Sequence, residues 1–96
     1  MFEVETIKNR LQSVFLNYNI NSAILFGSYA KGLATEKSDI DLMVDSNLRG
    51  LRFFALIEDI REALDEKTVD VFDVRHINDG SKVKNEIYST GVKIYG

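Results

Sequence analysis

Apolar residues recur every three or four positions over two long segments of the chain. The first segment runs from about residue 3 to 18, and the second from Leu51 to about Leu64. This spacing gathers the apolar side chains on one side of a helix, so both segments are predicted to be amphipathic α-helices. A shorter helix is predicted over residues 81–89, where Gly91 would end it.

Four shorter segments have the pattern of β-strands. Residues 22–26 are a short, mostly apolar run, and residues 39–44 alternate between polar and apolar side chains. Residues 68–74 are alternating and rich in β-branched types, and residues 92–95 are predicted to form a final edge strand. Between the first two strands, residues 28–32 are predicted to form a tight turn that opens a short helix.

The predicted order of elements is α-β-α-β-α-β, followed by a C-terminal helix and a short strand. Strands that alternate with helices favour an α/β or α+β fold in which a small mixed sheet is flanked by helices. The pattern does not determine the order or direction of the strands. Because 96 residues suffice for one small domain and not for two, residues 1–96 are predicted to form a single domain.

Composition and charge narrow the classes of protein to consider. The chain has no cysteine, which excludes disulfides and thiolate metal sites. It has neither the apolar segment of a secretory signal near its start nor an apolar run of about 20 residues that could span a bilayer. We therefore expect a cytoplasmic protein with no membrane partner. The net charge of −3 and the lack of a basic stripe argue against direct binding of nucleic acid.

Two aspartates lie close together on the second predicted strand. Asp39 and Asp41 are two positions apart, so their carboxylates point to the same side of the strand, with Cα atoms roughly 6.5 Å apart. Two like charges on one strand face repel each other, and a divalent cation between them would turn the arrangement into a favourable one. Mg²⁺ prefers oxygen ligands and commonly uses one or two protein carboxylates together with substrate phosphates. The alternative is an exposed strand face that carries two acids without a function.

The third predicted strand offers another carboxylate. Asp70 and Asp73 are three positions apart and must face opposite sides of that strand, so only one of them can join Asp39 and Asp41. A pair of metal ions about 3.5–4 Å apart needs a shared carboxylate and further ligands. Three aspartates could supply them, with one ion activating an attacking hydroxyl and the other holding a triphosphate.

A glycine-serine turn directly follows the first predicted strand. Gly27 permits a tight turn, and the backbone N–H groups after it could cradle anionic oxygens. Ser28 adds a hydroxyl donor, and Lys31 could add a positive charge. Many turns of this kind only connect a strand to a helix, which is the alternative interpretation.

The segment GSYAKGLATEKSDIDL, residues 27–42, resembles the signature of the polymerase-β-like nucleotidyltransferase superfamily. The shared pattern is Gly-Ser, then Arg or Lys followed by Gly, then Ser-Asp-Ile-Asp-Leu. The short length is similar to that of the minimal nucleotidyltransferase (MNT, MntA-type antitoxin) branch. The resemblance extends over nearly the whole chain, including the third strand and the closing V-K-I-Y. It implies the nucleotidyltransferase fold.

The resemblance also implies roles for individual residues. Gly27 and Ser28 would bind the nucleotide phosphates, and Asp39, Asp41 and Asp70 would hold two Mg²⁺ ions. Asp70 would also act as base toward the acceptor hydroxyl. Lys31 and Ser38 belong to the same signature and are expected on the nucleotide side of the site, although Lys31 stands where Arg is commoner in the family.

The resemblance implies an activity and a partner. The chain is expected to transfer AMP from ATP to a hydroxyl, that of a tyrosine, on a HEPN-domain toxin and so to act as its antitoxin. Two other functions stay open: a non-catalytic antitoxin that neutralises its partner by binding, and a transferase that acts on a small molecule. The complete carboxylate set favours an enzyme, and the shortness of the chain argues against a small-molecule acceptor.

Overall fold

The structure is a computed structural model that describes residues 1–96. Its elements, in chain order, are α1 (Val4–Asn17), β1 (Ser22–Phe26), α2 (Gly27–Lys31), β2 (Ile40–Asp45), α3 (Leu51–Ala63), β3 (Val69–Asp73), a 3₁₀ turn η1 (Val74–His76), α4 (Lys82–Thr90) and β4 (Val92–Tyr95). Every predicted helix and strand is confirmed. The sequence pattern did not predict η1, and β2 begins one residue later than expected, so Asp39 lies just before the strand.

The four strands form one mixed sheet in the order β3-β2-β1-β4. Strand β1 runs antiparallel to both β2 and β4, whereas β2 and β3 are parallel. Parallel neighbours need a crossover connection, and α3 provides it. The expected mixed sheet and the expected edge position of β4 are therefore confirmed.

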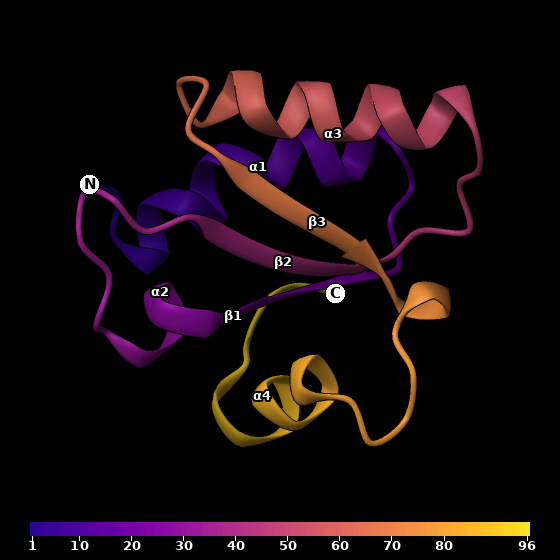
Figure 1. Ribbon diagram of the computed structural model, residues 1–96. Helices are drawn as coiled ribbons and strands as arrows, with labels where there is room; N and C mark the ends of the chain where they lie inside the picture. The colour runs from indigo at the N-terminus through magenta and orange to yellow at the C-terminus, as the bar shows by residue number, and fades with distance from the viewer.

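One face of the sheet forms the core of the molecule. Helices α1 and α3 lie side by side over this face (Figure 1). The alternate residues Ile40, Leu42 and Val44 of β2 are fully buried beneath them. They pack with Ile7, Leu11 and Phe15 of α1 and with Leu56 and Ile60 of α3. Burial of this apolar stripe drives both helices onto the sheet.

The opposite face of the sheet carries the chemistry-bearing residues. Strand parity sends Asp41 and Met43 of β2 to this side. Helix α4 lies across it, on the far side of the sheet from α1 and α3, and the short helix α2 lies beside it (Figure 1). The site is therefore built between the sheet, α2 and α4.

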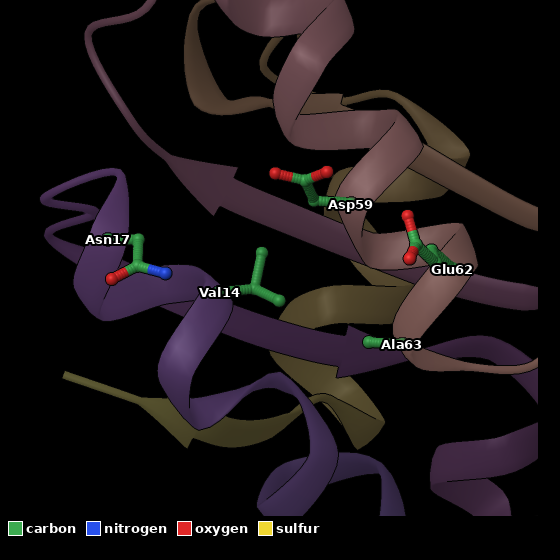
Figure 2. A pocket seen from close by; sticks show the side chains of 5 residues that line it. All are labelled: Val14, Asn17, Asp59, Glu62 and Ala63. Atoms are coloured by element: carbon green, nitrogen blue, oxygen red, sulfur yellow. The ribbon is translucent and has the colours of Figure 1, made fainter.

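A separate groove lies between α1 and α3. Figure 2 shows the side chains that line it, namely Val14, Asn17, Asp59, Glu62 and Ala63, around a volume of about 330 Å³. None of the predicted site residues lines it, and it lies on the side of the sheet opposite to Asp41 and Asp70. No helix in the molecule combines the length and the apolar character that crossing a bilayer demands.

Candidate active site

The strand register brings two of the three predicted aspartates side by side. Asp41 of β2 is directly opposite Asp70 of β3 in the parallel pair, so both side chains point to the face that α4 covers. Asp41 is half-buried, and Asp70 is exposed on an edge strand. Asp39 is exposed and precedes β2, which leaves it less constrained than the other two.

The carboxylate of Asp41 is held in an unfavourable environment. Burial, followed by the charges of Asp70, Asp39 and Glu86 and a hydrogen bond shared with Asp70, raises the pKa of Asp41 to about 6. No three acidic or histidine side chains converge closely enough to form a complete metal site. The joint coordination of one cation by all three aspartates therefore stays a prediction, although the clustered negative charge is of the kind that a hard cation would relieve.

Asp73 lies on the other side of β3, as strand parity requires. It is opposite Val44 and only 1% exposed. Its carboxylate accepts hydrogen bonds from the hydroxyl of Ser46, at 2.5 Å, and from the backbone N–H of Arg75, at 3.2 Å. Asp73 therefore anchors the start of η1 within the core layer and takes no part in the cluster around Asp41.

The predicted glycine-serine turn directly adjoins the acidic pair. Gly27 begins α2 immediately after β1 and has a φ of +74°. A Cβ atom at this position would lie 2.4 Å from Oδ2 of Asp41. Glycine is therefore required for two independent reasons, the left-handed backbone and the close approach of the carboxylate. The first N–H groups of α2, with the half-buried Ser28, lie beside Asp41 and can receive anionic oxygens.

Lys31 and Ser38 are engaged in contacts within the protein. The ammonium of Lys31, at the end of α2, forms an ion pair with Glu86 of α4 at 3.2 Å. The hydroxyl of Ser38 accepts a hydrogen bond from the backbone N–H of Thr35 at 2.9 Å. Ser38 thus shapes the loop that leads into Asp39, whereas Lys31 lies within reach of a ligand bound between α2 and α4.

Helix α4 supplies a wall of the site that sequence reasoning missed. A pocket of about 240 Å³ adjoins Asp41 and is lined by Phe26, Asp41, Phe72, Lys82, Val83 and Glu86. Three of these residues come from the strands and three from α4. The amphipathic pattern of α4 indicated a helix, but it contained no signal for the part of the sheet that the helix would cover.

Taken together, the site has an anion-binding turn on one side of an acidic pair and an exposed carboxylate on the other. Gly27 and Ser28 are next to Asp41, and Asp70 follows on the edge strand. A triphosphate over α2 would place its phosphorus beside Asp41, and a hydroxyl could approach from the side of Asp70. This arrangement is suited to transfer of a phosphorus-containing group.

Several known proteins are similar to this chain in sequence and in fold. Chain MJ1215 of Methanocaldococcus jannaschii, named as a candidate protein adenylyltransferase, is 35% identical over 65 residues, which cover 66% of this chain and 76% of the relative. A solved toxin–antitoxin structure with AMP-PNP matches with a TM-score of 0.73 and 26% identity, over 93% of this chain and 73% of the other.

A second solved structure agrees in fold. It is a complex of an MNT antitoxin with the tri-AMPylated HEPN toxin of Shewanella oneidensis, and it matches with a TM-score of 0.67 and 24% identity, over 96% of this chain and 71% of the other. The family model for polymerase beta nucleotidyltransferases matches residues 5–96, a range that holds the turn at Gly27 and all three aspartates. By this match, which covers almost its whole length, the chain belongs to the polymerase beta nucleotidyltransferase family.

Proposed function

We propose that this chain transfers AMP from ATP to a tyrosine hydroxyl of a HEPN-type toxin and thereby acts as its antitoxin. The observation that carries the proposal is the pairing of Asp41 with Asp70 directly beside the turn at Gly27. This geometry joins a phosphate cradle to acidic groups that can hold a cation and receive a proton. A protein that neutralised its partner by contact alone would not require it.

The relatives support the same function. MJ1215 is named as a candidate protein adenylyltransferase, which matches the proposed reaction. The toxin–antitoxin structure at 26% identity contains AMP-PNP, an ATP analogue, which supports ATP as the nucleotide donor. The exposure of Asp70 on an edge strand also suits a protein acceptor, since a docked partner can reach this carboxylate from outside.

We infer that Asp39, Asp41 and Asp70 would hold two Mg²⁺ ions, with phosphate oxygens of the nucleotide completing the ligand set. Carboxylate oxygens are hard ligands, and the clustered charges that raise the pKa of Asp41 would be neutralised by a divalent cation. When bound, such ions supply charge neutralisation for the triphosphate and lower the pKa of the attacking hydroxyl. The turn at Gly27 and Ser28 would orient the phosphates, with Lys31 adding a positive charge once it leaves Glu86.

The proposed reaction is an in-line displacement at the α-phosphorus of ATP. The acceptor oxygen forms a new bond to this phosphorus, while the bond from the phosphorus to the oxygen that bridges to the β-phosphate breaks. The electron pair of that bond leaves with pyrophosphate. The proton of the acceptor hydroxyl passes to the carboxylate of Asp70, which lies on the side away from the phosphate cradle.

The proposal is tested by intact mass spectrometry. The chain is incubated with its HEPN-type partner, Mg²⁺ and each NTP in turn, and the mass of the partner is measured. Addition of AMP raises the mass by about 329 Da per unit, as expected for a covalent modification. We expect this increase with ATP, and its loss in the Asp39→Ala/Asp41→Ala double variant.

Two results would contradict the proposal. If the partner keeps its mass yet is neutralised by both the wild type and the double variant, the chain acts by binding alone. If a small molecule gains the nucleotide and the partner does not, the chain is a small-molecule transferase. If the double variant transfers AMP at the wild-type rate, Asp39 and Asp41 do not hold the metal ions.

A further inference from the structure

We propose that the pocket beneath α4 is the acceptor subsite and that it binds the aromatic ring of a phenolic side chain, with the hydroxyl directed at Asp41 and Asp70. This inference rests on the proposed function, because it assigns the acceptor of that same reaction to a place in the fold. It makes α4 the element that selects tyrosine over serine or threonine.

The pocket has aromatic and aliphatic walls formed by Phe26, Phe72 and Val83, and it is also lined by the charged residues Asp41, Lys82 and Glu86. Phe26 and Phe72 face each other with ring centroids 5.9 Å apart and planes inclined by 45°. Val83 of α4 lines the pocket with them, and Asp41 supplies a carboxylate that a phenolic hydroxyl could meet. The volume of about 240 Å³ is sufficient for one flat ring. A ring packed against this aromatic pair would gain edge-to-face contacts beyond the burial of its area.

The spacing along β3 suits a phenol. Phe72 and Asp70 are alternate residues on the same side of the strand, so their Cα atoms are about 6.6 Å apart. This separation is comparable with the length of a tyrosine side chain from Cβ to the hydroxyl oxygen. A ring packed on Phe72 can therefore present its hydroxyl to Asp70, whereas a serine side chain is too short to use both contacts.

The direction of the reaction assigns the pocket to the acceptor. The attacking and leaving oxygens lie on opposite sides of the phosphorus in an in-line displacement. With the leaving pyrophosphate at α2, the acceptor must enter from the side of β3. The pocket extends to that side, because Phe72 of β3 lines it together with Val83 of α4, whereas Phe26 and Glu86 form the part of its lining next to α2.

Two valines provide matched reporters for the pocket. Val83 lines it, whereas Val74 lines a neighbouring apolar groove on the other side of α4, with Ile24 and Met43. The full chain, labelled at its valine methyl groups and saturated with Mg²⁺ and a non-hydrolysable ATP analogue, is titrated with N-acetyl-tyrosine amide. We expect the Val83 methyl resonances to shift through the ring current of the phenol and those of Val74 to stay. N-acetyl-serine amide should leave both unchanged.

The alternative occupant of the pocket is the nucleobase. If the ATP analogue alone shifts Val83 and the phenol adds nothing, the pocket binds the base and the inference is wrong. An absence of any shift at Val83 would equally overturn it. The phenol titration measures binding and does not depend on AMP transfer. A shift of the Val83 resonances together with an unmodified partner protein would therefore refute the proposed function but not the assignment of the subsite.

Kinetics supply a second measurement. Val83→Trp fills the pocket and should raise the KM for the acceptor protein by about tenfold or more, which corresponds to the loss of one well-packed aromatic contact. The dissociation constant for ATP should change by less than about twofold, because the nucleotide binds outside this pocket. Val74→Ala serves as the control and should alter neither constant. Weakened ATP binding in Val83→Trp with an unchanged acceptor KM would contradict the assignment.

Discussion

The backbone at Gly27 comes so close to Asp41 that no side chain fits between them. A Cβ on Gly27 would lie 2.4 Å from Oδ2 of Asp41 and 3.3 Å from its Cγ. The turn that would receive phosphates and the carboxylate that would hold a cation are thus in direct contact. A displacement of the turn would therefore also displace the carboxylate of Asp41. This contact couples the position of the bound nucleotide to that of the metal ion.

The first prediction separates this contact from the backbone strain. Gly32 also has a φ of +74° and ends α2, but nothing lies within 4 Å of its Cβ position. Gly27→Ala and Gly32→Ala should therefore each lower the free energy of unfolding by about 1 kcal/mol from the left-handed backbone. Only Gly27→Ala should also abolish AMP transfer, because it displaces Asp41. Thermal unfolding and the transfer rate measure both effects, and equal activity losses in the two variants would refute the role of the contact.

The second prediction concerns pH. The pKa of Asp41 is raised to about 6 by burial and by neighbouring carboxylates, so the folded chain holds a proton that the unfolded chain releases near pH 4. The free energy of unfolding of the metal-free protein should therefore fall as pH rises from about 4 to 6. Asp41→Asn removes the charge and should stabilise the fold above pH 6 by about 1 kcal/mol, after allowance for the partial exposure of the group.

Melting temperatures from pH 3.5 to 8 in the presence of a chelator test this dependence. Asp45→Asn, at the other end of β2, is the matched control and should keep the wild-type profile. Mg²⁺ with an ATP analogue should raise the melting temperature of the wild type by mass action and leave that of Asp41→Asn nearly unchanged. An identical pH profile in Asp41→Asn and the wild type would contradict the raised pKa of Asp41.

The third prediction distinguishes Asp70 from Asp73. Asp70→Asn should not lower the melting temperature, because the side chain is exposed and its charge repels Asp41, and it should lose most of the transfer activity. Asp73→Asn should retain the activity of the folded fraction and destabilise the fold by about 1–3 kcal/mol, since its buried hydrogen bonds to Ser46 and Arg75 are disturbed. The reverse pattern of activities would place the wrong aspartate in the site.

The fourth prediction concerns the ion pair between Lys31 and Glu86. Both side chains are partly exposed, so breaking the pair should cost at most about 1 kcal/mol. Lys31→Met should weaken binding of ATP with Mg²⁺ by about tenfold, through loss of a phosphate contact. Glu86→Gln should strengthen it, because the change removes a negative charge that faces Asp41 and releases Lys31. Calorimetric titration with a non-hydrolysable analogue measures both, and Lys31→Arg should bind like the wild type.

Short-range patterns in the sequence predicted the local elements and the side of each strand on which the polar residues lie. Helical spacing in α1 and α3 and alternation in β2 depend only on neighbours a few positions apart, so these elements followed from the pattern. The same alternation placed Asp41 opposite the buried residues of β2 and showed that Asp70 and Asp73 face opposite sides. The signature around Gly27 identified the family because its spacing reflects this local geometry.

The residues that meet across the sheet could be identified only from the folded chain. The parallel register of β2 and β3 pairs Asp41 with Asp70, and the position of α2 brings Gly27 against that carboxylate. The placement of α4, which adds Glu86 and the pocket at Phe72, was equally absent from the sequence pattern. These contacts join segments that are far apart along the chain. They depend on strand order and on packing of the whole core, which local periodicity does not encode.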